Sequence, residues 1–122
     1  SVLRALAEAA AEQRPAGVRV GAWMDGRRHE VFTALYDIVE PAGPGRAAVL
    51  SEVDAASVGA PTATLARWAD LGAPAVICGD GAVLYADQVS AYAQVPRHHH
   101  WREEHPYPSG LTASDMGEAQ DQ

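Results

Sequence analysis

The stretch VRVGAWMDGRRHEVFTALYDIV, residues 18–39, decides the fold. Asp25-Gly26 separates two apolar runs, and this dipeptide is a strong short signal for a β-hairpin turn. Asp and Gly both tolerate the positive φ that such a turn requires. We therefore predict two strands, residues 18–24 and 31–39, joined by a tight turn at Asp25-Gly26.

Both faces of this hairpin are apolar. Alternate residues of a strand point to opposite faces of a sheet, so each strand divides into two sets. On the first strand one face carries Val18, Val20, Ala22 and Met24, and the other carries Arg19, Gly21 and Trp23. On the second strand one face carries Val31, Thr33, Leu35 and Val39, and the other carries Phe32, Ala34, Tyr36 and Ile38. Because strands that are apolar on both faces need cover on both, we expect helices to pack on each side of the sheet.

The spacing of apolar residues and the positions of helix-capping residues predict the elements before and after the hairpin. Apolar residues at helical spacing predict a helix over residues 1–13, which Ser1 can cap. Residues 47–50 suggest a short strand, and Ser51-x-x-Asp54 is typical of a capping box, so we expect a short helix ending near Gly59.

A second helix is predicted to begin at a cap of Thr62 or Thr64 and to end at Gly72. Residues 75–78 form an apolar strand, a Gly-Asp-Gly turn follows, and residues 82–92 are predicted to be helical. The residues expected to face inward on these two helices are Leu65, Trp68, Ala69, Leu71, Val83, Leu84 and Val89.

The order of elements predicts an α/β fold, a small mixed sheet with a central β-hairpin and flanking helices. From residue 96 onward the chain is polar, contains prolines and has no period. We therefore interpret residues 1–95 as the folded domain and residues 96–122 as a partly disordered tail.

Composition narrows the classes of function. The chain has 122 residues, and nine basic against sixteen acidic residues give a net charge of −7. This acidity argues against direct nucleic-acid binding, which depends on neutralising phosphates. A single cysteine allows no intrachain disulfide, and no apolar run is long enough for a membrane span. We expect a cytoplasmic protein.

Three motifs in order resemble the TsaB/YeaZ family, the non-catalytic partners in bacterial synthesis of tRNA threonylcarbamoyladenosine (t6A). Residues 24–36, MDGRRHEVFTALY, resemble the family's "DARRGEVYxALY" hairpin. Residues 1–7, SVLRALA, resemble its "SSLEALA" helix start, and residues 75–82, AVICGDGA, its "VvGDGA" strand and turn. The resemblance covers roughly residues 1–90. Gly26 and His29 stand where the family usually has Ala and Gly.

The resemblance implies the C-terminal lobe of an actin-like (ASKHA) fold. The family's N-terminal half, with its "DTS" strand and "GPGSFTGLR" segment, has no counterpart in this chain. In that family the contacts with the partner and within the homodimer lie chiefly in that half. The resemblance therefore implies a scaffold for a TsaD-like catalytic subunit, with a possible homodimer, no catalytic residue and no cofactor.

Two short motifs are candidates for ligand sites. Gly79-Asp80-Gly81, between a strand and a helix, could place amides near a phosphate. A tight strand-to-helix turn is the simpler interpretation of the glycines, and Asp80 would repel an anion. His98, His99, His100 and His105, with neighbouring carboxylates, could bind zinc or nickel. Their spacing matches no H-E-x-x-H helix, so adventitious affinity of an exposed tail is the simpler interpretation.

Arg27, Arg28 and Glu30 flank the hairpin turn and are the candidate partner-binding residues, against the simpler interpretation of a solvated turn with local ion pairs. Cys78, in an apolar strand, is best explained as a small core residue. The scaffold is the first hypothesis for function. The alternative is a small metal-binding or peptidase-like hydrolytic domain that uses the His-rich tail.

Overall fold

Four strands form one mixed sheet in the computed structural model, which describes residues 1–96. The sheet order is β3-β2-β1-β4, with β1, β2 and β3 antiparallel and β4 parallel to β1. The strands are β1 (Arg19–Arg27), β2 (Glu30–Glu40), β3 (Val49–Gly59) and β4 (Val76–Cys78), and the helices are α1 (Val2–Ala11), α2 (Pro61–Leu71), α3 (Asp80–Leu84) and α4 (Ala86–Val89). The predicted mixed α/β class with a central hairpin is confirmed.

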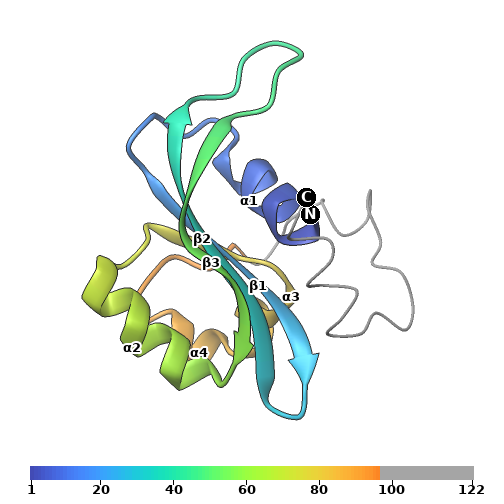
Figure 1. Ribbon diagram of the computed structural model, residues 1–122, viewed down its shortest axis with the longest axis vertical. Coiled ribbons are helices and arrows are strands. Elements are labelled where there is room, and N and C mark those ends of the chain that lie inside the picture. The colour runs from blue at the N-terminus through green and yellow to red at the C-terminus, as the bar shows by residue number, and fades with distance from the viewer. Residues whose placement is uncertain (97–122) are drawn as a thin grey trace.

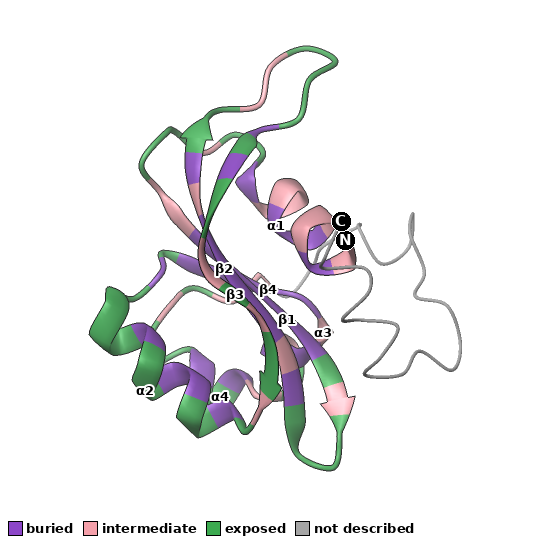
Figure 2. Ribbon diagram, viewed as in Figure 1, coloured by how far each residue is buried: buried purple, intermediate pink, exposed green. Residues whose placement is uncertain are grey.

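Helices cover both faces of the sheet, as the two apolar faces of the hairpin predicted. Helix α1 lies on one face, and α2 and α4 lie on the other (Figure 1). Figure 2 shows the buried residues gathered on the central strands and on the sides of the helices that face them. The α1 face buries Leu3, Leu6, Ala7, Val20, Ala22, Met24, Ala34, Tyr36 and Ile38, and the α2 face buries Trp23, Val31, Leu35, Leu65, Trp68, Ile77 and Val89.

Helix α1 begins as predicted and ends earlier. Ser1 is its N-cap, and its Oγ accepts a hydrogen bond from the Arg4 amide at 3.1 Å. The helix ends at Ala11, and Gln13 already has a φ of 65°. A left-handed residue this close to the helix end reverses the chain, which then enters β1.

The hairpin turn lies further along the chain than Asp25-Gly26, so that prediction was wrong. Arg27 pairs with Glu30, which leaves Arg28 and His29 as the two turn residues. A bulge at Gly26 interrupts the register between Asp25 and Arg27. With this longer hairpin, Val31 to Asp37 lie opposite Arg19 to Asp25, so the apolar residues of both strands are buried together. A turn at Asp25-Gly26 would slide much of the second strand past the end of the first.

The prediction of a short strand followed by a helix over residues 47–59 was also wrong. These residues contain the single strand β3, which pairs with β2 along most of its length. Register shifts at three places break the alternation of burial along it. Asp54, expected to cap a helix, instead accepts hydrogen bonds from Trp68 Nε1 at 2.8 Å and from the Arg67 guanidinium at 3.0 Å.

Helix α2 is capped by Ala60 with Pro61 in its first turn, so neither Thr62 nor Thr64 is the cap. Its C-cap is Gly72, as predicted. The expected inward set is only half right, because Leu65 and Trp68 are buried whereas Ala69 and Leu71 are exposed. Trp68 lies against Gly21, where a Cβ would come within 2.4 Å of the Trp68 ring.

The segment after β4 is two short helices rather than one. Helices α3 and α4 meet at Tyr85, and Val89 faces the core as predicted, but Leu84 is 59% exposed. Beyond them Gln94 pairs in parallel with β4, its carbonyl accepting from the Ile77 amide at 2.9 Å. This bridge covers part of the free edge of β4.

Candidate functional site

The Gly79-Asp80-Gly81 turn is fitted against the backbone at the end of β1. Gly79 has a φ of 107°, and a Cβ there would lie 2.1 Å from the carbonyl oxygen of Trp23. A Cβ on Gly81 would lie 3.0 Å from the carbonyl carbon of Met24. Both positions therefore require glycine because the backbone of β1 lies too close for a Cβ. Gly79 also requires glycine because its φ is positive.

The Asp80 side chain accepts a hydrogen bond from β1 beyond the point where β4 ends. The last paired residues of these strands are Ala22 and Cys78. Further along β1, the Asp25 amide donates to Asp80 Oδ1 at 2.9 Å, so a carboxylate accepts a hydrogen bond as a neighbouring strand's carbonyl would. The carboxylate that would repel an anion is thus directed to the hairpin. A nucleotide role for this turn stays a prediction.

The three segments that carry the TsaB resemblance meet at this place. The helix start contributes Leu6, whose Cδ1 would lie 3.4 Å from a Cβ on Gly79 and whose carbonyl accepts from Cys78 Sγ at 3.5 Å. The hairpin contributes the backbone of Met24 and Asp25, and the third segment contributes residues 78–81. Motifs far apart in the sequence therefore form one packed junction.

The hairpin tip presents Arg27, Arg28 and His29 in a left-handed backbone conformation. Their φ angles are 69°, 52° and 62°. Side chains rarely adopt this region, and each such residue costs about 1–3 kcal/mol unless its surroundings compensate. Beyond the strand pairing, the Asp25 carboxylate supports the tip by accepting from the Arg27 amide at 2.9 Å.

The tip side chains are exposed and are not held by the fold. All residues from Arg27 to Glu30 are exposed. Among residues 1–96 the ion pairs are Arg19–Asp37 and Arg67–Asp54, so the local ion pairs considered for the turn are not formed within that part. Arg27, Arg28 and Glu30 thus lie together and accessible, as a partner contact requires, and their role stays a prediction.

A clamp between Arg19 and Asp37 was missed by sequence reasoning. Arg19 Nε and Nη2 donate to the two carboxylate oxygens of Asp37 at 2.7 and 3.1 Å, and Nη1 donates to the carbonyls of Leu71 and Gly72. Hydrogen bonding and charge raise the pKa of Arg19 and lower the pKa of Asp37. The clamp ties the end of α2 to the sheet; only the opposite charges at paired strand positions could have indicated it.

Cys78 offers no nucleophile at this junction. Its side chain is buried, and Sγ donates to the carbonyls of Gly21 and Leu6. Burial raises the pKa of the thiol to about 12, so the reactive thiolate is scarce at neutral pH. This agrees with the core role predicted for Cys78.

Buried polar atoms on the α2 face were also not anticipated. Trp23 and Thr33 lie opposite each other on β1 and β2, and both are buried. Within residues 1–96 neither Trp23 Nε1 nor Thr33 Oγ1 has a hydrogen-bond partner. The Trp23 ring packs edge-on against Trp68, with centroids 6.1 Å apart.

No group of three or more His, Cys, Asp or Glu side chains within residues 1–96 could hold a metal ion. The proposed ligands His98, His99, His100 and His105 lie outside the described residues, as does the predicted tail. No helix of the described part is both long and apolar enough to cross a membrane.

No protein-family model matches the sequence, and no curated protein matches it. The likeness to the TsaB family therefore depends on the three motifs and on how they meet in the fold.

Proposed function

We propose that this chain is a TsaB-like lobe, a non-catalytic scaffold in t6A synthesis that supports a TsaD-like catalytic subunit. The observation that carries the proposal is the junction of the three motif segments. Leu6 in the helix start accepts from Cys78, and the Asp25 amide in the hairpin donates to Asp80 in the glycine turn. Chance likenesses scattered along a chain have no reason to converge in space, whereas parts of one inherited design do.

The topology gives further support. A three-stranded antiparallel meander followed by a helix and a strand parallel to β1 is compatible with a lobe of the actin-like fold. The tip supplies a more local argument. The resembling hairpin usually has Gly at position 29, and here His29 has a φ of 62°, which is a conformation that favours glycine.

The chemistry of the junction fits a scaffold better than an enzyme. The one thiol there is buried with its pKa raised, and the Asp80 carboxylate is bonded to a backbone amide. The exposed groups lie at the hairpin tip, where they could contact a partner. The proposal places the protein in the cytoplasm, where it would act beside tRNA without binding it directly.

The first experiment measures t6A in tRNA from cells depleted of this protein. The proposal predicts a fall in t6A that is restored by expressing the gene again. An unchanged t6A content would contradict the scaffold role outright. A second measurement is a pull-down in which the 122-residue chain is tested against the TsaD-like subunit of the same genome.

A further inference from the structure

We infer that the hairpin tip is a docking element and that it binds a carboxylate-bearing surface of a partner protein. The inference rests on the proposed function for the identity of that partner, a TsaD-like subunit. It adds a contact within this chain to the contacts that the resemblance places in another half.

The arginines of the described part fall into two groups. The first group has side chains that hydrogen-bond within the fold, namely Arg4, Arg14, Arg19 and Arg67. The second group is Arg27, Arg28 and Arg46, whose side chains have no hydrogen bond or ion pair within residues 1–96. Two of these three are adjacent and occupy the hairpin tip.

The tip extends past the third strand. The pairing of β3 with β2 ends at Gly59 opposite Val31, so residues 26–30 have only each other as strand neighbours. In Figure 1 this end of β1 and β2 projects beyond the helices. A projecting tip can reach into a partner's surface without any rearrangement of the sheet.

The residue types at the tip are unfavourable for the backbone conformation of this turn. A two-residue turn with positive φ at both positions favours Asn-Gly, and this chain has Arg28-His29 there. A glycine is present only three residues earlier, at Gly26, where no positive φ is required. Strained residues persist where the surrounding structure or the function requires them. Within residues 1–96, no hydrogen bond or ion pair of the Arg28 or His29 side chain explains these residue types.

The chemistry of the side chains selects the partner. A guanidinium donates two parallel hydrogen bonds to a carboxylate, and two adjacent arginines suit a pair of acidic side chains. Nucleic acid is the poorer match, because two arginines neutralise few phosphates and the chain as a whole carries −7.

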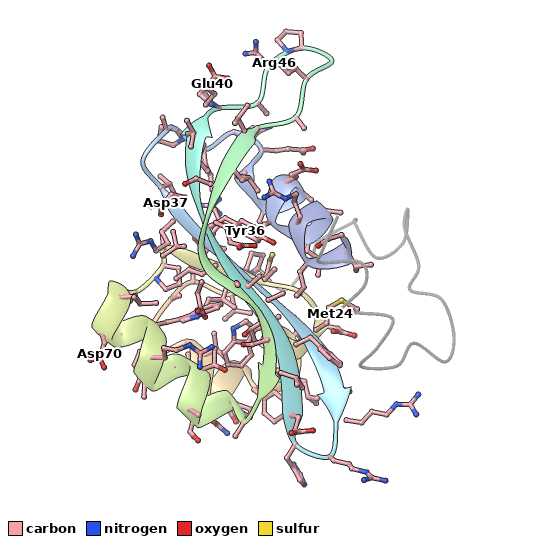
Figure 3. The ribbon with its side chains drawn as sticks, in the orientation of Figure 1. Met24, Tyr36, Asp37, Glu40, Arg46 and Asp70 are labelled. Atoms are coloured by element: carbon pink, nitrogen blue, oxygen red, sulfur yellow. The ribbon has the colours of Figure 1, made fainter. Side chains whose placement is uncertain are left out.

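The test compares variants of the 122-residue chain in binding to the TsaD-like subunit. One variant carries Arg27→Gln and Arg28→Gln, which remove charge and leave the backbone unchanged. A second carries Arg28→Asn and His29→Gly, which suit the turn better. The control is Arg46→Gln, an exposed arginine at the opposite end of the sheet, as Figure 3 shows.

We expect the unsubstituted chain to bind, and to bind less well as salt is raised. Both tip variants should bind about tenfold more weakly or worse, and the Arg46→Gln control should bind normally. The Asn-Gly variant should lose binding even though its thermal stability rises, an outcome that a purely structural tip would not give.

Three outcomes would overturn the inference. In the first, both tip variants bind as tightly as the control. In the second, the unsubstituted chain does not bind the subunit at all. In the third, an unmodified tRNA transcript binds the chain through Arg27 and Arg28 while the subunit does not, which would favour a nucleic-acid contact. The t6A content of depleted cells decides the proposed function separately from all three.

Discussion

Two tight turns lie at the same end of β1, and they differ in the residue types that occupy their positive-φ positions. At Gly79 a positive φ coincides with a backbone contact that leaves no room for a Cβ, and the sequence has glycine. At Arg28 and His29 the φ angles are also positive, yet the sequence has two large exposed side chains. The fold dictates the first choice and does not explain the second, so the hairpin tip is the better place to look for function.

The largest expected effect is Gly79→Ala. The new Cβ would meet the Trp23 carbonyl oxygen at 2.1 Å, and alanine would also be strained at a φ of 107°. We expect a loss of about 3 kcal/mol or more in the free energy of unfolding, measured by urea denaturation. Gly59→Ala is the control, because a Cβ there meets nothing within 4 Å. Equal effects of the two substitutions would show that the glycine turn does not depend on this close contact.

Asp80→Ala tests the other half of the same turn. It removes the acceptor of the Asp25 amide and leaves that donor dependent on water. We expect a loss of about 1–2 kcal/mol in the free energy of unfolding, measured by the same denaturation. Asp80→Asn keeps an acceptor oxygen and should recover most of this stability. An Asn variant as unstable as the Ala variant would mean that the charge of Asp80, rather than its hydrogen bond, matters.

Some features of the hairpin and its neighbouring strand could be predicted from the sequence, and others could not. The two faces of each hairpin strand could be predicted from alternation. Val20 and Trp23 are an odd number of positions apart, so their side chains point to opposite faces of the sheet. The position of the turn could not be predicted, because long-range pairing and burial outweighed the local preference of Asp25-Gly26. Strand β3 was hidden because its bulges break the period of two.

The candidate site was predictable in position and not in arrangement. The sequence motifs by themselves single out Arg27, Arg28 and Gly79. The left-handed backbone at the tip could not be read from Arg-Arg-His, since these residues rarely adopt it. The pairing of Asp80 with Asp25 depends on the contact between two segments 55 residues apart, which no local pattern contains.

Arg19→Gln and Arg28→Gln extend the comparison to two arginines. Arg19 is bonded to Asp37 and to two carbonyls at the end of α2, so its loss should lower the free energy of unfolding by about 1 kcal/mol after allowance for solvent screening. Arg28 has no such partner among residues 1–96, so its loss should change stability by less than about 0.5 kcal/mol. Chemical denaturation of both variants measures the two effects.

The Arg19 effect should depend on pH in one direction. The Asp37 carboxyl has a pKa below its ordinary 3.8, because Arg19 donates hydrogen bonds to the charged form. The pair therefore stabilises the fold above pH 3.8, and that stabilisation is lost as the pH falls through the folded pKa. The difference between Arg19→Gln and the unsubstituted chain should shrink on acidification. A difference that stayed constant down to acid pH would show that the carbonyl contacts alone account for it.

A further expected effect has the opposite sign and bears most directly on the comparison. Replacing Arg28-His29 with Asn-Gly should raise the free energy of unfolding by about 0.5–1 kcal/mol, because both new residues tolerate positive φ. His29→Gly alone should supply most of this gain, and it restores the residue that the resembling hairpin usually has. Thermal denaturation measures the gain. A tip that is destabilised by Asn-Gly would show that Arg28 and His29 hold the turn through contacts of their own, and the difference between the two turns would then be one of degree.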